Sequence, residues 1–512
     1  MTTHKERQSQ DKRYQITKGA LDEVDERFSS SKWLVSALDK IFPDHWSFMV
    51  GEIAMDSLII LIVTGIYLAL YYVPSSTEVV YAPTSGVVYH PLVGHSMSEA
   101  YQSVINLSFN VRFGLIMRQA HHWAALIFLA AVFFHMARIF FTGAFRKPRE
   151  INWIIGLLLW QIVALEGFTG YSLPDDLLSG DGLRVIYSII QTIPFIGTWL
   201  SYALWGGRFP GTDLVPRLFV VHEFLFPLVI VGLLTAHLMI LWHQKHTDFP
   251  GPGKTETNIR GSRVWPQYAM KAGGLMMLVA SVTFFMAGFI QINPVWLYGP
   301  FNTYNVSAGT QPDWYLGWQD GALRLWPHWE FRSFGHEIPN QFFPGLILPG
   351  ILLTLMFAWP AIDRIIYKDH DRHNLLDRPR DKPFRTGVGA AAVVFFIDLT
   401  MACGTDLLAN NLHIAFERLI EILQWGAFVG PIVAFFLAYR TCLALQRTGT
   451  HPIQRPIGGI IYRTAEGGYH TVGDVHAAHG DHAGDNGHAG VAHAGIDKAS
   501  AAEHAPDPVA GD

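Results

Sequence analysis

Eight apolar stretches, each about long enough to cross a lipid bilayer, constrain the fold of this chain more than any other feature. A membrane-spanning helix needs about 20 mostly apolar residues, because lipid offers no hydrogen-bond partner to exposed backbone groups. So many such stretches in one chain argue against a soluble protein with buried helices. We therefore expect an all-α integral membrane protein with eight transmembrane helices, near residues 52–73, 119–142, 152–172, 218–242, 268–291, 342–360, 387–403 and 425–444.

Basic residues gather in alternate segments and predict the orientation of these helices. Five segments together hold 26 Lys or Arg residues, whereas the four segments between them hold six. Loops rich in Lys and Arg stay in the cytoplasm, so both termini are expected there, and the second and fourth helices then run in the same direction. The basic segments are 1–50, 143–151, 243–266, 361–386 and 445–512, and the others are 74–117, 173–216, 293–341 and 404–424.

Composition excludes several classes of function. The net charge of −5 is too small to suggest a nucleic-acid partner. The two cysteines, Cys403 and Cys442, are too few for a disulfide framework, an iron–sulfur cluster or a covalently attached haem. The first 40 residues contain no apolar core of a signal peptide.

The chain is expected to have four parts. Residues 1–50 form a cytoplasmic segment, 51–243 a four-helix bundle and 244–445 a second membrane domain of four helices. Residues 446–512 are rich in Ala, Gly and His and have little to bury, so we expect a disordered cytoplasmic tail. Between the third and fourth helices, an apolar run interrupted by Pro194 predicts one or two short interfacial helices.

Four histidines at membrane depth carry the main functional signal. His121 and His135 are 14 residues apart on the second helix, and His222 and His237 are 15 apart on the fourth. At about 100° per residue each pair returns near one helix face, with a rise of roughly 21 to 22 Å. A kink expected at Pro227 absorbs part of the remaining rotation on the fourth helix. The two helices therefore offer two histidine pairs at matching depths.

Two imidazoles that face each other at one depth can ligate a haem iron from both sides. Such ligation leaves no open position for oxygen and favours electron transfer. A single buried histidine is more often a packing residue, but two pairs at equal depths are hard to explain in that way. We expect His121 with His222 to hold one non-covalent haem b and His135 with His237 to hold a second. His122, one residue off this face, is expected to be structural.

Glycines on the neighbouring helices recur at the same interval. Gly51 and Gly65 on the first helix are 14 residues apart, as are Gly156 and Gly170 on the third. Glycine allows close approach to the backbone, so this spacing suggests room for two haem rings. Ordinary packing of membrane helices on small residues explains these glycines equally well.

Charged residues flank the histidines. Arg118, Arg138 and Arg217 are placed to pair with haem propionates, and snorkelling at the membrane boundary is the alternative. Glu166 and Asp56 are predicted to lie inside the membrane, where each acts as a proton relay or as a hydrogen-bonded strut.

Taken together, these motifs resemble cytochrome b of the quinol:cytochrome c oxidoreductase (cytochrome bc) complexes over about residues 30–445. The resemblance includes GYSLP at residues 170–174 and PDWY at residues 312–315, which is similar to the Pro-Glu-Trp-Tyr loop of the family. The 15-residue interval, the GYSLPDD loop and the long tail resemble the actinobacterial branch most. That branch oxidises menaquinol and often associates with a terminal oxidase.

The resemblance implies roles for the PDWY loop. Asp313 would take a proton from quinol near the outer face, and Tyr315 would act beside it as the second catalytic residue. Pro312 and Trp314 would complete the outer quinol site. Capping of a loop helix is the alternative role for Asp313.

Two regions depart from the family pattern. Asp175 and Asp176 follow GYSLP where the family usually has Trp-Gly. On the inner side, the histidine usually found five residues after the last haem ligand and the usual Lys-Asp pair are both altered. Lys271, His243 and Glu52 are therefore the candidates for the inner quinone site.

The resemblance implies a catalytic subunit of a quinol–cytochrome c reductase in a bacterial plasma membrane. One electron of each quinol would pass to a Rieske-type iron–sulfur subunit, and the other through both haems to a quinone at the inner face, which contributes to proton translocation. A c-type cytochrome subunit, a second copy of the complex and a terminal oxidase are the implied partners. From the residues alone, a di-haem anchor of another quinone-linked dehydrogenase or reductase and a non-redox transporter stay open.

Overall fold

Eight long apolar helical segments dominate the computed structural model, which describes residues 22–23, 25–27, 30–258, 260–307, 309–333, 335–447, 460–463 and 469–472. Their number among these residues, and their composition, confirm the predicted all-α membrane fold. The segments are Trp46–Ala69, Gly114–Phe141, Glu150–Ser172, Leu214–Gln244, Val264–Phe289, Phe343–Tyr367, Pro383–Cys403 and Phe416–Arg447. The chain divides into two units, Met1–Thr450 and His451–Asp512.

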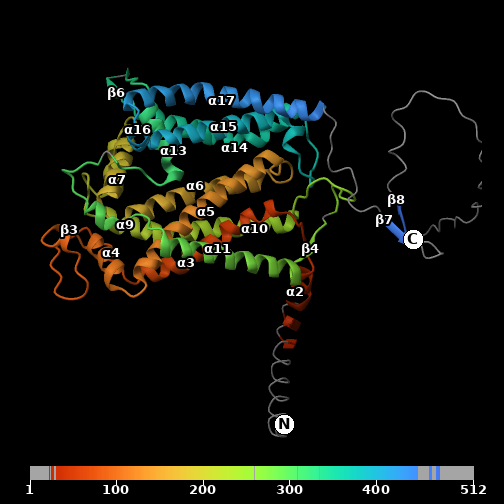
Figure 1. Ribbon diagram of the computed structural model, residues 1–512, viewed down its shortest axis with the longest axis horizontal. Coiled ribbons are helices and arrows are strands. Elements are labelled where there is room, and N and C mark those ends of the chain that lie inside the picture. Colours follow the sequence, from red (N-terminus) through yellow and green to blue (C-terminus); the bar gives the residue numbers. More distant parts are fainter. Residues whose placement is uncertain are drawn as a thin grey trace, which may run out of the picture. The chain divides into compact units, whose positions relative to one another are not determined.

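The first four segments form a bundle in which helices far apart in sequence lie side by side (Figure 1). Helix α3 (Val50–Ala69) packs on α5 (Gly114–Thr142), and α6 (Glu150–Ser172) packs on α10 (Phe226–Gln244). A fifth helix, α11 (Ala269–Phe289), packs against α3 and α5. The bundle core is an apolar layer formed mainly by Ala54, Phe128, Leu129, Ala131, Val163 and Ile230, with Tyr315 at its edge.

The remaining long helices pack mainly on one another. Helix α15 (Pro383–Cys403) lies against α17 (Phe416–Arg447) and against the shorter α13 (Trp314–Leu325), while α14 (Leu348–Tyr367) contacts α6. The α13–α15 contact is close because Gly321 lacks a Cβ atom, which would lie within 1.7 Å of the Leu399 carbonyl oxygen. Helix α13 also touches α5 and so brings the PDWY loop to the first bundle.

Short elements mark the two ends of the bundle (Figure 1). Helices α4 (Glu99–Asn110) and α7 (Leu177–Gln191) lie at one end, called here the α7 end, and α2 (Ser30–Leu38) lies at the opposite, α2 end. The interfacial run interrupted by Pro194 forms two helices, α7 and α8 (Gly197–Trp205), as predicted. Helices α12 and α16 span Val295–Tyr298 and Thr405–Leu412, and the 3₁₀ turns η1, η2 and η6 span Trp46–Phe48, His90–Leu92 and Pro379–Asp381.

Three small antiparallel pairs of strands connect loops of the first unit. They are β1 (Ile41–Phe42) with β4 (Ser262–Arg263), β2 (Glu78–Val80) with β3 (Ser96–Ser98), and β5 (Phe331–Ser333) with β6 (His336–Ile338).

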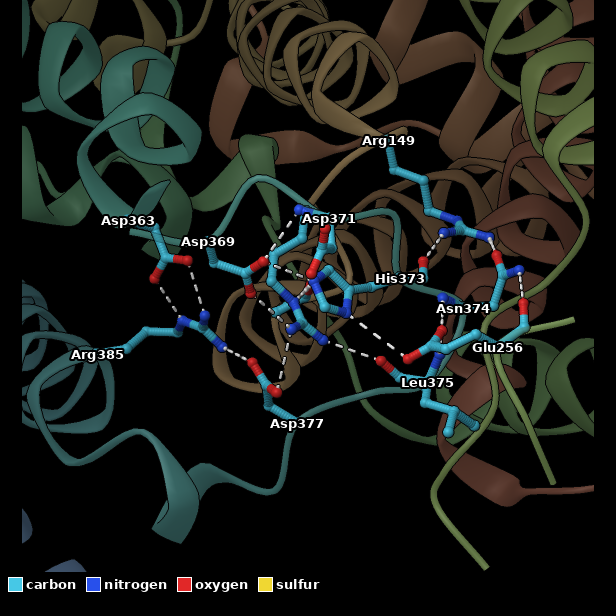
Figure 2. A network of polar contacts seen from close by, with 12 residues as sticks. Arg149, Glu256, Asp363, Asp369, Asp371, His373, Asn374, Leu375, Asp377 and Arg385 are labelled. Atoms are coloured by element: carbon cyan, nitrogen blue, oxygen red, sulfur yellow. Dashed lines mark hydrogen bonds and ion pairs between the residues drawn. The ribbon is translucent and has the colours of Figure 1, made fainter. Parts of the chain in front are cut away.

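Three loops that the basic-residue pattern places in the cytoplasm are joined by a network of ion pairs and hydrogen bonds (Figure 2). The fully buried Arg385 donates two hydrogen bonds of 2.8 Å to Asp363 and one of 2.7 Å to Asp377. Arg149 donates to the His373 carbonyl oxygen at 2.6 Å. The basic residues therefore fix the loops to one another in addition to biasing their side of the membrane.

The predicted disordered tail is described only in part. Gln446 and Arg447 end α17, and β7 (Ile460–Arg463) pairs antiparallel with β8 (Tyr469–Val472). The other residues of 446–512 lie outside the described residues, as does most of the segment before α2.

Candidate functional site

The four predicted histidines form two facing pairs. The ring centroids of His121 and His222 are 6.3 Å apart with an interplanar angle of 72°, and those of His135 and His237 are 6.5 Å apart at 69°. A metal–imidazole bond is about 2 Å long, so two rings on opposite sides of one metal have centroids about 6 Å apart, counting roughly 1 Å from each nitrogen to its ring centre. Both spacings fit one hexacoordinate metal between each pair.

The described part of the chain contains no group of three or more His, Cys, Asp or Glu side chains able to hold a bare metal ion. A pair of imidazoles suits a metal whose other positions are filled by a macrocycle, as in haem.

The rings of the first pair are oriented through their Nδ1 atoms. His222 Nδ1 lies 3.0 Å from the Glu166 carbonyl oxygen, which can only accept, so this nitrogen carries the hydrogen. A Glu166 carboxylate oxygen lies 3.2 Å from the same atom. Thr64 Oγ1 donates to the Ile60 carbonyl oxygen at 2.7 Å and can therefore accept from His121 Nδ1 at 2.9 Å. Both rings keep Nε2 for a metal, which is how second-shell partners commonly orient a ligating histidine.

Each of the four predicted glycines faces one of the four imidazoles. A Cβ atom at Gly170 would lie 2.4 Å from His222, at Gly51 3.1 Å from His135, at Gly65 3.3 Å from His121, and at Gly156 3.6 Å from His237. The sequence suggested that these glycines make room for haem rings. The structure places them against the ligands themselves, so what they leave free is the volume of the imidazoles.

A π-helical turn, η3 (Val221–Leu225), carries His222 and lies between α9 (Leu214–Val220) and α10. A π turn closes its hydrogen bonds over one more residue than an α turn, so it holds an extra residue. The 15-residue interval from His222 to His237 is thereby brought close to the facing of the 14-residue interval on α5. The sequence assigned this correction to a kink at Pro227, which begins just after the π turn.

Two of the three predicted arginines have donors available for an anion. Arg118 donates to the Asn293 carbonyl oxygen at 3.0 and 3.1 Å, but its buried Nε has no hydrogen-bond partner within the described residues. Arg138 stacks on Phe48, 4.1 Å from the ring centroid, and its buried Nε and Nη2 likewise have none there. Buried guanidinium donors of this kind suit a carboxylate such as a haem propionate.

The structure does not bring Arg217 to the same place. Its side chain is about half exposed and folds back onto α8, where it donates to the carbonyl oxygens of Ala203 and Leu204 at 2.6 and 3.2 Å. It also pairs with Asp213 at 3.3 Å.

A partly open cavity of ≈ 920 Å³ adjoins the first histidine pair, a volume in the range of ligand sites. Its walls include both imidazoles of this pair, Arg118, Tyr171, Asp313 and Tyr315. The Tyr315 ring reaches this wall because Gly167 lacks a Cβ atom, which would lie 2.3 Å from the phenol oxygen.

Asp313 precedes α13 at the N-cap position, but its side chain makes no capping hydrogen bond. Instead, its two carboxylate oxygens each lie 3.1 Å from His122 Nε2, and Tyr315 donates to one of them at 3.4 Å. The capping alternative is therefore not the arrangement present. Trp314 is the first residue of α13, with its ring 6.1 Å from that of Tyr315, and Pro312 is half-buried in the loop before it.

The inner-site candidates lie near the second histidine pair or beyond it. Glu52, near the start of α3, accepts a hydrogen bond from Tyr268, and Lys271 pairs with Asp44 at 2.5 Å. His243 is exposed near the end of α10 and is not brought to this group.

The sequence interpretation missed His246, three residues after His243. Its ring lies 4.1 Å from that of Phe42, and burial, with Lys40, Arg149 and Arg138 nearby, lowers its pKa to about 4. The run WHQKH, with two histidines just after a membrane helix, was the available signal.

Comparison with known proteins adds independent information. The family model described as Cytochrome b(N-terminal)/b6/petB matches residues 126–300. The chain is 48% identical over 450 residues to the cytochrome bc1 complex cytochrome b subunit of Mycobacterium leprae (strain TN), a match that covers 88% of this chain and 81% of that protein.

Proteins with the same name from Corynebacterium diphtheriae and Streptomyces coelicolor are 45% and 47% identical. These matches cover 85% and 80% of this chain and 79% and 74% of the respective relatives. Among solved structures, one described as a hyperthermophilic respiratory Complex III shares the fold, with a TM-score of 0.61 and 22% identity over 82% of this chain and 98% of that one.

Proposed function

The chain belongs to the family of cytochrome b subunits of cytochrome bc1 complexes, and on this basis we propose that it oxidises menaquinol in the cavity between the first histidine pair and Asp313. The family inferred from the motifs, with its actinobacterial branch, is thereby confirmed. The chain is a multi-pass membrane subunit of a respiratory oxidoreductase. A transporter, or the anchor of another dehydrogenase, is no longer needed to explain the buried histidines.

One observation carries the proposed quinol site: Asp313 and Tyr315 line the same cavity as His121 and His222. Quinol must release protons as it is oxidised, and a carboxylate at the wall of a mostly apolar cavity is a suitable acceptor. Asp313 is the acceptor in this proposal, and the Tyr315 hydroxyl beside it completes the polar edge of the site.

Two non-covalent haems b, one at each histidine pair, are the proposed cofactors. When bound, they supply one-electron transfer along the bundle, so that one electron of each quinol reaches a quinone at the α2 end while the other leaves to a Rieske-type iron–sulfur subunit. The chain orients the imidazoles through Glu166 and Thr64. Arg118 and Arg138 offer their buried donors to the propionates.

The proposed orientation puts the α2 end in the cytoplasm and the α7 end outside a bacterial plasma membrane. Protons from quinol are then released outside, and protons for the inner quinone are taken up inside, near Glu52 and Lys271. A c-type cytochrome subunit, a second copy of the complex and a terminal oxidase are the proposed partners.

Three measurements on the purified complex test this proposal. A pyridine haemochrome assay should find two haems b per chain, and finding none would refute the function. His237→Leu should abolish one component of the reduced-minus-oxidised spectrum and leave the other, whereas two unchanged components would refute the ligand assignment.

Asp313→Asn should slow quinol oxidation roughly 100-fold or more, the usual contribution of a positioned proton acceptor, with both haem components unchanged. Asp313→Glu, which restores the carboxylate of the wider family, is the matched control and should retain most of the activity. Equal turnover of Asp313→Asn and the parent complex would remove Asp313 from the reaction.

A further inference from the structure

His122 links α5 to the loop that carries the proposed proton acceptor. It directly follows the candidate ligand His121, yet its Nε2 lies 3.1 Å from each carboxylate oxygen of Asp313, a residue 191 positions later in the chain. Both side chains are mostly buried, with 14% and 16% of their surfaces exposed, and both line the cavity beside the first histidine pair. A charge-assisted contact at this burial is stronger than the same contact in water.

The orientation of the Asp313 carboxylate has two alternatives. An aspartate at the N-cap of a helix ordinarily turns its carboxylate onto the free N–H groups of the first turn. Asp313 occupies that position before α13, but its carboxylate faces His122 and makes no capping bond. The other contact in the cavity, from Tyr315, is longer at 3.4 Å. His122 is therefore the closest donor that favours the cavity over the helix terminus.

We propose that His122 is a positioning residue for quinol oxidation, whose Nε2–H holds the Asp313 carboxylate in the cavity and away from the N-terminus of α13. This inference rests on the proposed role of Asp313. Aspartate is one methylene shorter than the glutamate usual in the family, so it has less reach toward a substrate. A donor on α5 compensates by fixing the short carboxylate at the cavity wall.

The test compares two variants of similar size in the purified complex. His122→Gln keeps a terminal N–H donor, whereas His122→Leu has none. His122→Leu should lower kcat for quinol oxidation by about tenfold or more, as expected for a lost hydrogen bond to a charged group. KM should stay within about twofold, and His122→Gln should recover to within about threefold of the parent kcat. The reduced-minus-oxidised spectrum reports in the same samples whether the neighbouring His121 still ligates.

Three outcomes overturn the inference. They are parent-like turnover of His122→Leu, equal slowing by Leu and Gln with intact spectra, and loss of the His121 component in both variants. In an Asp313→Asn background, His122→Leu should add no further loss, and an additive loss would also overturn it. If Asp313→Asn alone turns over normally, the proposed function fails. If only His122→Leu does, the positioning role fails and the proposed function stands.

Discussion

Replacing Gly170 by alanine should displace the His222 imidazole and remove the haem of the first site, whereas the same change at Gly156 should be tolerated. A Cβ atom at position 170 would lie 2.4 Å from Cε1, 2.9 Å from Nε2 and 3.0 Å from Nδ1 of His222. At position 156 the nearest atom, Cε1 of His237, would be 3.6 Å away. Both glycines lie in α6, so the two variants add the same methyl group to the same helix.

The size of the effect follows from these distances. An ordinary carbon–carbon contact requires about 3.5 Å, so the His222 ring would have to retreat by about 1 Å. A ligand–metal distance is correct only to within about 0.2 Å. Overpacking of a filled site costs about 1–3 kcal/mol, which corresponds to a roughly five- to 150-fold weaker hold on the haem. Gly51 and Gly65, with closest contacts of 3.1 and 3.3 Å, should fall between the two extremes.

The pyridine haemochrome assay and the reduced-minus-oxidised spectrum of the purified complex measure this directly. Gly170→Ala should contain about one haem per chain and lack one spectral component, while Gly156→Ala should contain both. Full haem content in Gly170→Ala, or equal losses in the two variants, would refute the view that these glycines make room for the imidazoles.

Three further predictions concern other parts of the chain. Gly167→Ala should push the Tyr315 phenol from its seat and slow quinol oxidation with both haem components retained, and unchanged kinetics would contradict this. Burial raises the pKa of Asp176 to about 6, so the free energy of unfolding should fall as pH rises from about 4 to 6, by ~3 kcal/mol at most. Asp176→Asn should flatten that dependence in thermal unfolding and keep the helix cap on Leu178, whereas an unaltered slope would count against it. Arg385→Met should cost about 3–5 kcal/mol by leaving Asp363 unpaired, and Asp363→Leu in the same chain should restore part of it in the same assay.

Local patterns were sufficient to predict the helices and the histidine pairs. Apolar length predicts the number of membrane segments, and periodicity on two helices predicts which histidines share a depth. Gly51 and Gly170 were found for the same reason, since they repeat at the histidine interval. Their contact with the imidazoles needed the packing of α3 on α5 and of α6 on α10, which no spacing within one helix contains.

Contacts between distant segments account for what the sequence did not reveal. His122 was interpreted as structural because it lies off the ligand face, and nothing local indicates that Asp313 reaches it from the start of α13. Arg217 has the right distance in sequence from His222, but its side chain follows the carbonyl groups of α8 and not the cavity. His246 lies beyond the apolar run of α10, so a search confined to membrane depth passes over it.

The π-helical turn at Val221–Leu225 separates the length of the fourth membrane helix from its rotational register. Removing one residue within the turn would return an ordinary α turn and leave every side chain from Pro227 to the α2 end pointing as before. The same deletion near Ile230 would swing His237 by about 100° and part it from His135. The bundle thus tolerates a change in chain length at one ligand and not between the two, which confines insertions and deletions in this helix to the α7 side of the membrane.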